Sequence, residues 1–302
     1  MTPRPLKVRV GFGPGAAVAD AAAFAALVDA LEGLGFDSLW LSERATGPTL
    51  DPLVALSVAA GRTERLKLGT SVQVLPGRNP VLLAKGWASL DRLSGGRALP
   101  AFGLGVVDRE EQQAFGVARD ERSSRFDEAL TVIRRLWTED RIDHDGSWFH
   151  YDGVGIGIQP VQRPPDVWLG GRSTGELRRV GRSGDGWLPS FQTPDAVAAG
   201  RQVVEAAAAD AGRSIDPEHW GALVAYSPSE IPSPVLDQLR RRLPGVEPTE
   251  VVPVGYDALR RTLEGFVAAG FSKLVPVPLG APIADWDTEL TALAAATLDL
   301  QT

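Results

Sequence analysis

The sequence predicts a single (β/α)8 barrel, a closed sheet of eight parallel strands that alternate with helices. Two observations predict it: short apolar runs recur eight times along the 302 residues, and stretches with helical periodicity separate them. The length suits one such barrel, so we expect one domain over residues 1–302. The expected strands are residues 8–12, 38–41, 67–74, 98–104, 167–169, 186–189, 221–226 and 273–279.

The expected helices carry apolar side chains three to four residues apart, which is the spacing of one buried face. Three such stripes are Trp87, Leu90 and Leu93; Phe126, Leu130, Ile133 and Leu136; and Leu259, Leu263, Phe266 and Val267. Two helix ends are near copies, with Gly35 before Phe36 and Gly270 before Phe271. In each we expect a left-handed glycine after the helix and a phenylalanine that folds back onto it.

Two long segments lie between the expected barrel elements. Residues 106–165 follow the fourth strand, and residues 227–253 follow the seventh. Both begin after a strand and therefore at the face where barrel active sites are built. We expect both to be insertions within the one domain.

Composition excludes several classes of protein. A net charge of −7 argues against a nucleic-acid partner, and the absence of cysteine excludes disulfides and thiolate-ligated metals. No run approaches the roughly 20 apolar residues of a membrane span, and residues 1–15 do not read as a signal peptide, so we expect a cytoplasmic protein without a membrane partner. His144, His150 and His219 lack metal-ligand spacing, and we expect no metal.

The turn after the fifth strand carries the clearest local signal for a ligand. Two glycines, Gly170 and Gly171, precede Arg172 and Ser173, where a helix is expected to begin. Backbone N–H groups at such a turn and helix start favour a phosphate, and an arginine adds a bidentate contact. The alternative is a tight turn in which Ser173 only caps the helix.

Two rival motifs fit less well. Ser173 also lies in a Gly-x-Ser-x-Gly sequence, but His219 precedes its strand whereas Ser173 follows its own, which separates them by about 20 Å in a parallel sheet. Residues 11–16 match a loose dinucleotide-binding pattern, in which Pro14 lacks the N–H that a phosphate would need. We expect residues 11–16 to form the first loop of the barrel mouth.

Polar residues end other strands as well, at residues 42–44, 69–73 and 102–108. Together these segments resemble the luciferase-like monooxygenase superfamily over about residues 6 to 280. The most specific parts are LLAK at 82–85 with LDRLSGGR at 90–97, then ERSSRFDEAL at 121–130 with LW at 136–137, WLGG at 168–171 and GDGW at 184–187.

The resemblance implies a barrel that binds coenzyme F420 or FMN, with the ring in the barrel mouth. It implies a non-proline cis peptide at Ser71-Val72 that backs the ring. The branch that resembles this chain most is the F420-dependent one, and its members are often homodimers. The resemblance implies that Gly170 and Gly171 hold the phosphate, and from the turn itself we expect Arg172 and Ser173 to do so as well. We further expect Thr70, Ser71, Val72, Glu43, Gly103 and Gly105 to surround the cofactor, and Arg44 and Asp108 to face the substrate as the catalytic residues.

The chain departs from the F420 branch at the end of the second strand. Many members have Ser-Asp-His there, whereas this chain has Ser42, Glu43 and Arg44, and an arginine does not act as a base near neutral pH. We therefore expect an F420-dependent hydride transfer to or from a small organic substrate, such as reduction of an activated double bond. The alternatives are an FMN-dependent monooxygenase and a non-catalytic barrel that binds the cofactor.

Overall fold

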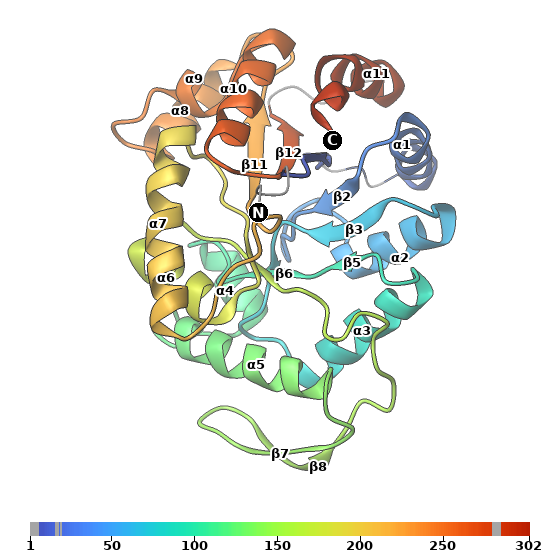
Figure 1. The fold of residues 1–302 in the computed structure, drawn as a ribbon, viewed down its shortest axis with the longest axis vertical. Helices are drawn as coiled ribbons and strands as arrows, with labels where there is room; N and C mark the ends of the chain where they lie inside the picture. Colours follow the sequence, from blue (N-terminus) through green and yellow to red (C-terminus); the bar gives the residue numbers. More distant parts are fainter. Residues whose placement is uncertain (1–5, 16–17, 19, 280–284) are drawn as a thin grey trace, which may run out of the picture.

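All eight expected strands are present in the barrel, and two of them are divided (Figure 1). The computed structural model describes residues 6–15, 18, 20–279 and 285–302. Ala16 of the loose dinucleotide pattern lies outside the described residues. The barrel strands are β1 (Arg9–Val10), β2 (Ser38–Leu41), β3 (Lys67–Thr70), β4 (Gln73–Val74), β5 (Ala98–Leu99), β6 (Ala101–Gly103), β9 (Trp168–Leu169), β10 (Gly186–Trp187), β11 (Gly221–Tyr226) and β12 (Lys273–Pro278).

Parallel pairing closes these strands into a ring, which confirms the predicted fold. The hydrogen-bonded orders are β1-β12-β11, β10-β9-β6-β4 and β2-β3-β5. Single bridges join the groups: Phe12 pairs with Leu39, and Trp187 pairs with Trp220. The third strand joins the remaining two groups, because its β3 half pairs with β5 and its β4 half pairs with β6. All strand C-termini therefore point to one mouth.

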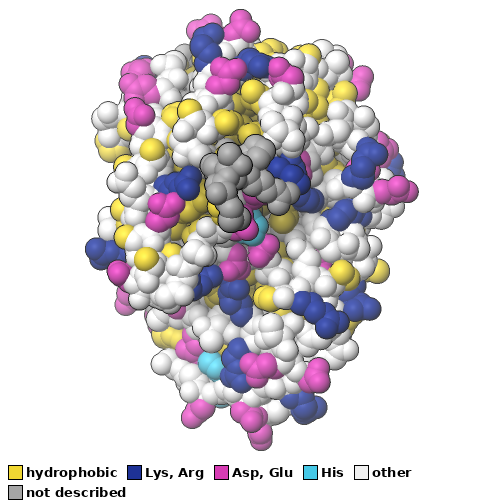
Figure 2. Space-filling view, viewed as in Figure 1, with side chains coloured by type: hydrophobic (Ala, Val, Ile, Leu, Met, Phe, Trp, Pro, Cys, Tyr) yellow, Lys and Arg dark blue, Asp and Glu magenta, His cyan; other side chains and the backbone are white. Residues whose placement is uncertain are grey.

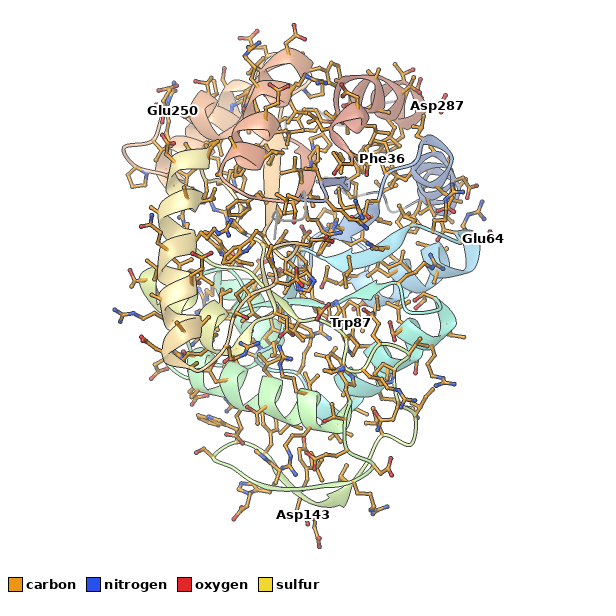
Figure 3. All side chains as sticks on the ribbon, viewed as in Figure 1. Phe36, Glu64, Trp87, Asp143, Glu250 and Asp287 are labelled. Atoms are coloured by element: carbon orange, nitrogen blue, oxygen red, sulfur yellow. The ribbon has the colours of Figure 1, made fainter. Side chains whose placement is uncertain are left out.

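Helices surround the sheet in the expected alternation (Figure 1). The outer helices are α1 (Ala21–Leu34), α2 (Pro52–Arg62), α3 (Pro80–Leu93), α5 (Arg122–Leu136), α6 (Thr174–Ser183), α7 (Pro194–Asp210), α10 (Tyr256–Ala268) and α11 (Trp286–Thr297), with a 3₁₀ turn at Leu298–Leu300. Residues 106–165 add α4 (Arg109–Phe115) and an antiparallel hairpin of β7 (Ile142–Asp145) and β8 (His150–Val154), and residues 227–253 add α8 (Ser233–Arg242) and α9 (Pro248–Val251). Figure 3 places Asp143 of the hairpin and Glu250 of α9 toward opposite ends of the molecule.

Large side chains facing glycines fill the barrel interior. Trp40 and Trp168 are buried there with their rings 6.0 Å apart, edge to face. A Cβ on Gly69 would lie 2.5 Å from Trp40, and one on Gly186 would lie 2.6 Å from Trp168. Pairing a large residue with a small one on the next strand is how a barrel of this size packs without voids.

The helix ends and stripes agree with the sequence except at one position. Gly35 and Gly270 have φ of 89° and 83°, and Phe36 and Phe271 are buried as predicted. The prediction that Leu93 is buried is wrong, because its side chain is 80% exposed at the last turn of α3. Its helical spacing from Leu90 is right, but Leu93 is the last residue of α3, where the described elements leave its side chain exposed.

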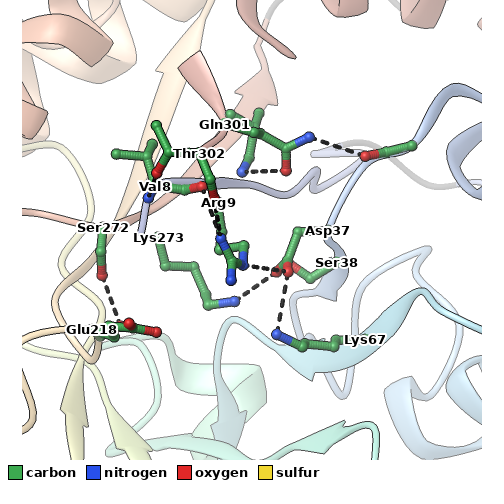
Figure 4. Close-up of polar contacts among 12 residues, drawn as sticks. Val8, Arg9, Asp37, Ser38, Lys67, Glu218, Ser272, Lys273, Gln301 and Thr302 are labelled. Atoms are coloured by element: carbon green, nitrogen blue, oxygen red, sulfur yellow. Dashed lines mark hydrogen bonds and ion pairs between the residues drawn. The ribbon is translucent and has the colours of Figure 1, made fainter. Parts of the chain in front are cut away.

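An ion cluster closes the opposite, N-terminal end of the barrel (Figure 4). The buried Asp37 carboxylate receives Lys273 Nζ at 2.6 Å and Lys67 Nζ at 3.2 Å, and Arg9 Nε lies 3.5 Å away. Although burial opposes ionisation of Asp37, the two lysines lower its pKa. Asp37 therefore ties three strand starts together at the barrel floor.

Candidate active site

A cavity of about 480 Å³ lies among the C-terminal ends of the strands. It is lined by segments that follow β1, β2, β3, β6, β9, β10, β11 and β12, so the site is at the predicted face. Nine of the predicted site residues line it: Glu43, Arg44, Ser71, Val72, Gly103, Gly105, Gly170, Gly171 and Arg172. Thr70, Asp108 and Ser173 are not among the lining residues.

Val72 forms one apolar wall of this cavity. The peptide bond between Ser71 and Val72 is cis, as the sequence predicted. The Val72 side chain packs over two glycines: a Cβ on Gly103 would overlap its Cγ2, and one on Gly170 would lie 3.2 Å from its Cγ1. Glycine at both positions lets Val72 lie flat against the strands, which leaves room in the cavity beyond it.

Glu43 lines the cavity while its carboxylate is already engaged. The residue is 8% exposed, forms an ion pair with Arg78, and accepts a hydrogen bond from the Val74 N–H at 2.7 Å. Burial raises the pKa of Glu43, and the Arg78 guanidinium opposes that shift. These contacts join the end of β2 to β4, so Glu43 helps to hold the Val72 wall in place.

Arg44 is held by an acidic residue that the sequence did not single out. Its Nε donates to Glu111 Oε1 at 3.2 Å, and Glu111 also accepts the N–H groups of Ala45 and Thr46 and the Thr46 hydroxyl. Burial acts against ionisation of Glu111, but these hydrogen bonds lower its pKa. Glu111, on α4 of the 106–165 insertion, thus orders the loop after β2 and compensates the Arg44 charge.

The turn at residues 170–173 is tight, and Glu176 occupies the amides of Arg172 and Ser173. Glu176 Oε2 accepts the Arg172 N–H at 3.0 Å, the Ser173 N–H at 2.9 Å and the Ser173 hydroxyl at 2.8 Å. Gly171 has a φ of 121°, and a Cβ there would lie 2.5 Å from Glu176 Cβ. The amides of Arg172 and Ser173, which the sequence assigned to a phosphate, serve a helix-capping box.

Two predicted residues serve the fold and not the cavity. The Asp108 carboxylate caps α4 by accepting the N–H groups of Glu110 and Glu111 at 2.9 and 3.1 Å. The fully buried Thr70 hydroxyl donates to the Ala101 carbonyl at 2.7 Å and accepts the Ala101 N–H at 3.0 Å. Backbone groups therefore satisfy both side chains, those of the first turn of α4 for Asp108 and those of a neighbouring strand for Thr70.

Four arginines line the mouth: Arg44, Arg172, Arg179 and Arg242. Arg179 Nε is neutralised by Asp127 at 2.6 Å. The Arg242 guanidinium lies 5.4 Å above the Phe191 ring. Arg179, Phe191 and Arg242 were not predicted from the sequence. The available signal was the basic run at residues 240–242, and such a run is usually a solvated helix end.

The rival hydrolase arrangement is absent from the structure. His219 lines a separate cavity at the barrel floor with Arg9, Lys67 and Lys273, whereas Ser173 caps α6 beside the mouth.

Within the described ranges, no group of three or more His, Cys, Asp or Glu side chains could hold a metal ion. The described helices also include none that is both long and apolar enough to cross a bilayer. Figure 2 shows acidic and basic side chains interspersed over the face drawn.

Sequence comparison with known families gives one match that covers most of the chain. The model for the family described as luciferase-like monooxygenase matches residues 6–250. The phthiodiolone/phenolphthiodiolone dimycocerosates ketoreductase of Mycobacterium kansasii is 32% identical over 161 residues, which are 52% of this chain and 43% of that protein. The F420-dependent glucose-6-phosphate dehydrogenase of Intrasporangium calvum is 34% identical over 170 residues, 52% of this chain and 50% of that protein.

The chain spans about half the length of the curated relatives it matches. Among solved structures, an F420-dependent secondary alcohol dehydrogenase in complex with an F420–acetone adduct superposes with a TM-score of 0.81. That match covers 98% of this chain and 100% of the other at 17% identity. It confirms the fold.

Proposed function

This chain belongs to the luciferase-like monooxygenase family, and on that premise we propose that it is a coenzyme F420-dependent oxidoreductase. The reaction is hydride transfer between the deazaflavin and a small organic substrate, and the bound cofactor supplies the hydride-carrying carbon. A relative that is 34% identical over 170 residues, the dehydrogenase of Intrasporangium calvum, is named for this cofactor.

The observation that carries the proposal is the pairing of a flat apolar wall with a cationic rim in one cavity. Val72, lying over Gly103 and Gly170, offers a surface against which a planar ring can stack. Arg172 stands at the edge of the same cavity and can neutralise the cofactor phosphate. Because Glu176 occupies the amides of Arg172 and Ser173, we assign the phosphate contact to the Arg172 side chain rather than to those two amides.

The remaining residues position the site. Glu43 and Arg78 fix the strand behind Val72, and Glu111 holds Arg44 where it can face a substrate. We assign no catalytic role to Asp108, because its carboxylate caps α4.

The test is titration of the purified protein with F420 and, separately, with FMN, followed by tryptophan fluorescence. We expect F420 to bind more tightly than FMN, and reduced F420 to be reoxidised by a substrate panel without consumption of oxygen. FMN binding accompanied by oxygen consumption would overturn the proposal in favour of a monooxygenase. Tight F420 binding without turnover on any substrate would favour a non-catalytic barrel.

We also propose a homodimer formed through α2 and α3, which pack side by side. Their outer surfaces expose apolar side chains to an unusual degree: Val54 is 64% exposed, Leu82 73% and Leu93 80%. Leu50, just before α2, and Val58 of α2 are also exposed. Exposed apolar residues gathered on two neighbouring helices are typical of protein–protein interfaces.

A further inference from the structure

Two arginines at the cavity mouth, Arg172 and Arg242, differ from the other two in having no acidic partner. Arg44 is paired with Glu111 and Arg179 with Asp127. No Asp or Glu in the described part of the chain lies within 4.0 Å of the Arg172 or Arg242 guanidinium. The remaining residues, 1–5, 16–17, 19 and 280–284, include no Asp or Glu, so they add no carboxylate side chain.

The two arginines come from different elements. Arg172 follows β9 and stands beside Gly170 and Gly171. Arg242 ends α8, in the 227–253 insertion, which Figure 1 shows on the side of the barrel by β11. Both charges face one cavity, and like charges brought together without a counter-ion attract an anion.

Apolar residues surround Arg242, and one of them has an unusual backbone conformation. Its guanidinium lies 5.4 Å from the Phe191 ring, and Phe191 holds a φ of 53°, which is uncommon for a residue other than glycine. Leu243, Ala225 and Leu279 line the cavity next to them. Partial burial lowers the pKa of Arg242, which is otherwise exposed, and the charges of Arg172 and Arg44 in the same cavity lining lower it further.

We propose that Arg242 and Phe191 form the substrate end of the cavity and select a small organic anion with an apolar body, such as a carboxylate or a phosphate monoester. This inference rests on the proposed function, in which Arg172 serves the cofactor. Arg242 binds the anionic group, while Phe191, Leu243 and Ala225 contact the hydrocarbon part. The three glutamates that line the same cavity already have partners. Glu43 pairs with Arg78, Glu111 pairs with Arg44, and Glu176 caps the start of α6, so the Arg242 charge is available to a ligand.

The test uses calorimetric titration of F420-loaded protein with hexanoate, hexyl phosphate and the neutral hexanamide. We expect either anion to bind at least about tenfold more tightly than the amide, as a charge-assisted hydrogen bond implies. The preference for the anions should vanish in Arg242→Ala and persist in Arg241→Ala, which removes the same charge from an exposed position of α8 outside the cavity lining. Preference for one anion over the other identifies the headgroup.

Two outcomes would overturn the inference. One is equal affinity for hexanoate, hexyl phosphate and hexanamide in the unmodified protein. The other is a loss of F420 affinity in Arg242→Ala as large as that in Arg172→Ala, which would make Arg242 part of the cofactor site. Failure of the unmodified protein to bind F420 would instead contradict the proposed function, and the same titrations on the cofactor-free protein would still decide the role of Arg242.

Discussion

Glu176 Oε2 accepts the Ser173 hydroxyl at 2.8 Å and so places a carboxylate where the sequence predicted the cofactor phosphate. The same oxygen accepts two backbone N–H groups of the turn. An internal anion at the start of α6 both stabilises the helix and repels a ligand phosphate.

Replacement of Glu176 by glutamine is expected to separate these two effects. Glu176→Gln should lower the free energy of unfolding by about 1 kcal/mol, as loss of a cap does, and should tighten F420 binding because a negative charge leaves the turn. Urea unfolding and F420 titration measure the two quantities. Glu110→Gln, with the same charge change at an exposed position of α4, serves as the control. Weaker F420 binding in Glu176→Gln would contradict the assigned phosphate position.

The contribution of Glu111 to the free energy of unfolding is expected to decrease as the pH is lowered. Its pKa is lowered in the folded protein, so its contribution is complete above the ordinary glutamate pKa of about 4.3 and is lost as the pH falls through the lower, folded value. Glu111→Gln should therefore be less stable than the unmodified protein at pH 7, and this difference should shrink at pH 4 and below. A difference that stays constant with pH in urea unfolding would count against the ion pair with Arg44.

A methyl group on Gly103 is expected to disturb the Val72 wall. Gly103→Ala forces the new Cβ against Val72 Cγ2, and such overpacking should cost about 1–3 kcal/mol and weaken F420 binding as Val72 moves into the cavity. Gly33→Ala is the control, because a Cβ there meets nothing within 4 Å on the exposed side of α1. That change should be neutral or stabilising. Unchanged F420 affinity in Gly103→Ala would show that Val72 does not contact the cofactor.

Removal of the acid at the barrel floor is expected to be the most damaging of these changes. Asp37→Asn leaves the buried Lys273 without its counter-charge and should cost about 3–5 kcal/mol. Lys67→Ala removes a half-exposed partner of the same carboxylate and should cost at most about 1 kcal/mol. Equal losses in urea unfolding would show that the cluster does not depend on the buried pair.

The proposed dimer is expected to dissociate when charge is placed on α3. The double change Leu82→Glu and Leu93→Glu should yield a monomer by light scattering after gel filtration, while circular dichroism stays unchanged. Val107→Glu introduces a charge at another exposed apolar residue, outside α2 and α3, and should leave the dimer intact. A monomeric unmodified protein at every concentration would exclude this interface.

Local signals were sufficient to predict the barrel. Gly35 and Phe36 specify a helix end through one glycine conformation and one contact, and the same pair recurs at Gly270 and Phe271. The spacing of apolar residues located every barrel strand within a few residues. It failed at Leu93, because periodicity gives the face of a helix but not where the neighbouring elements end.

The candidate site was only partly predictable for a different reason. Glycines and polar residues at strand ends pointed to Val72, Gly103, Gly170 and Arg172 because the topology brings all strand ends together. Arg242 and Phe191 contact each other across 51 positions, and no local pattern encodes such a contact. Asp108 and Thr70 do not line the cavity, because a polar side chain near a strand end can equally form hydrogen bonds with backbone groups.

The 227–253 insertion has a small hydrophobic core, and its two ends lie side by side. Ile231, Leu239 and Val252 pack together apart from the main core, and Ser227 pairs with Val254 where the segment leaves and rejoins the barrel. Because its two ends meet, we expect the segment to accept changes of length and sequence that keep its contact with Ala225 of β11. The residue that we assign to substrate selection therefore sits on a replaceable module, so homologues or engineered chimaeras could acquire new substrates while the cofactor half of the mouth stays unchanged.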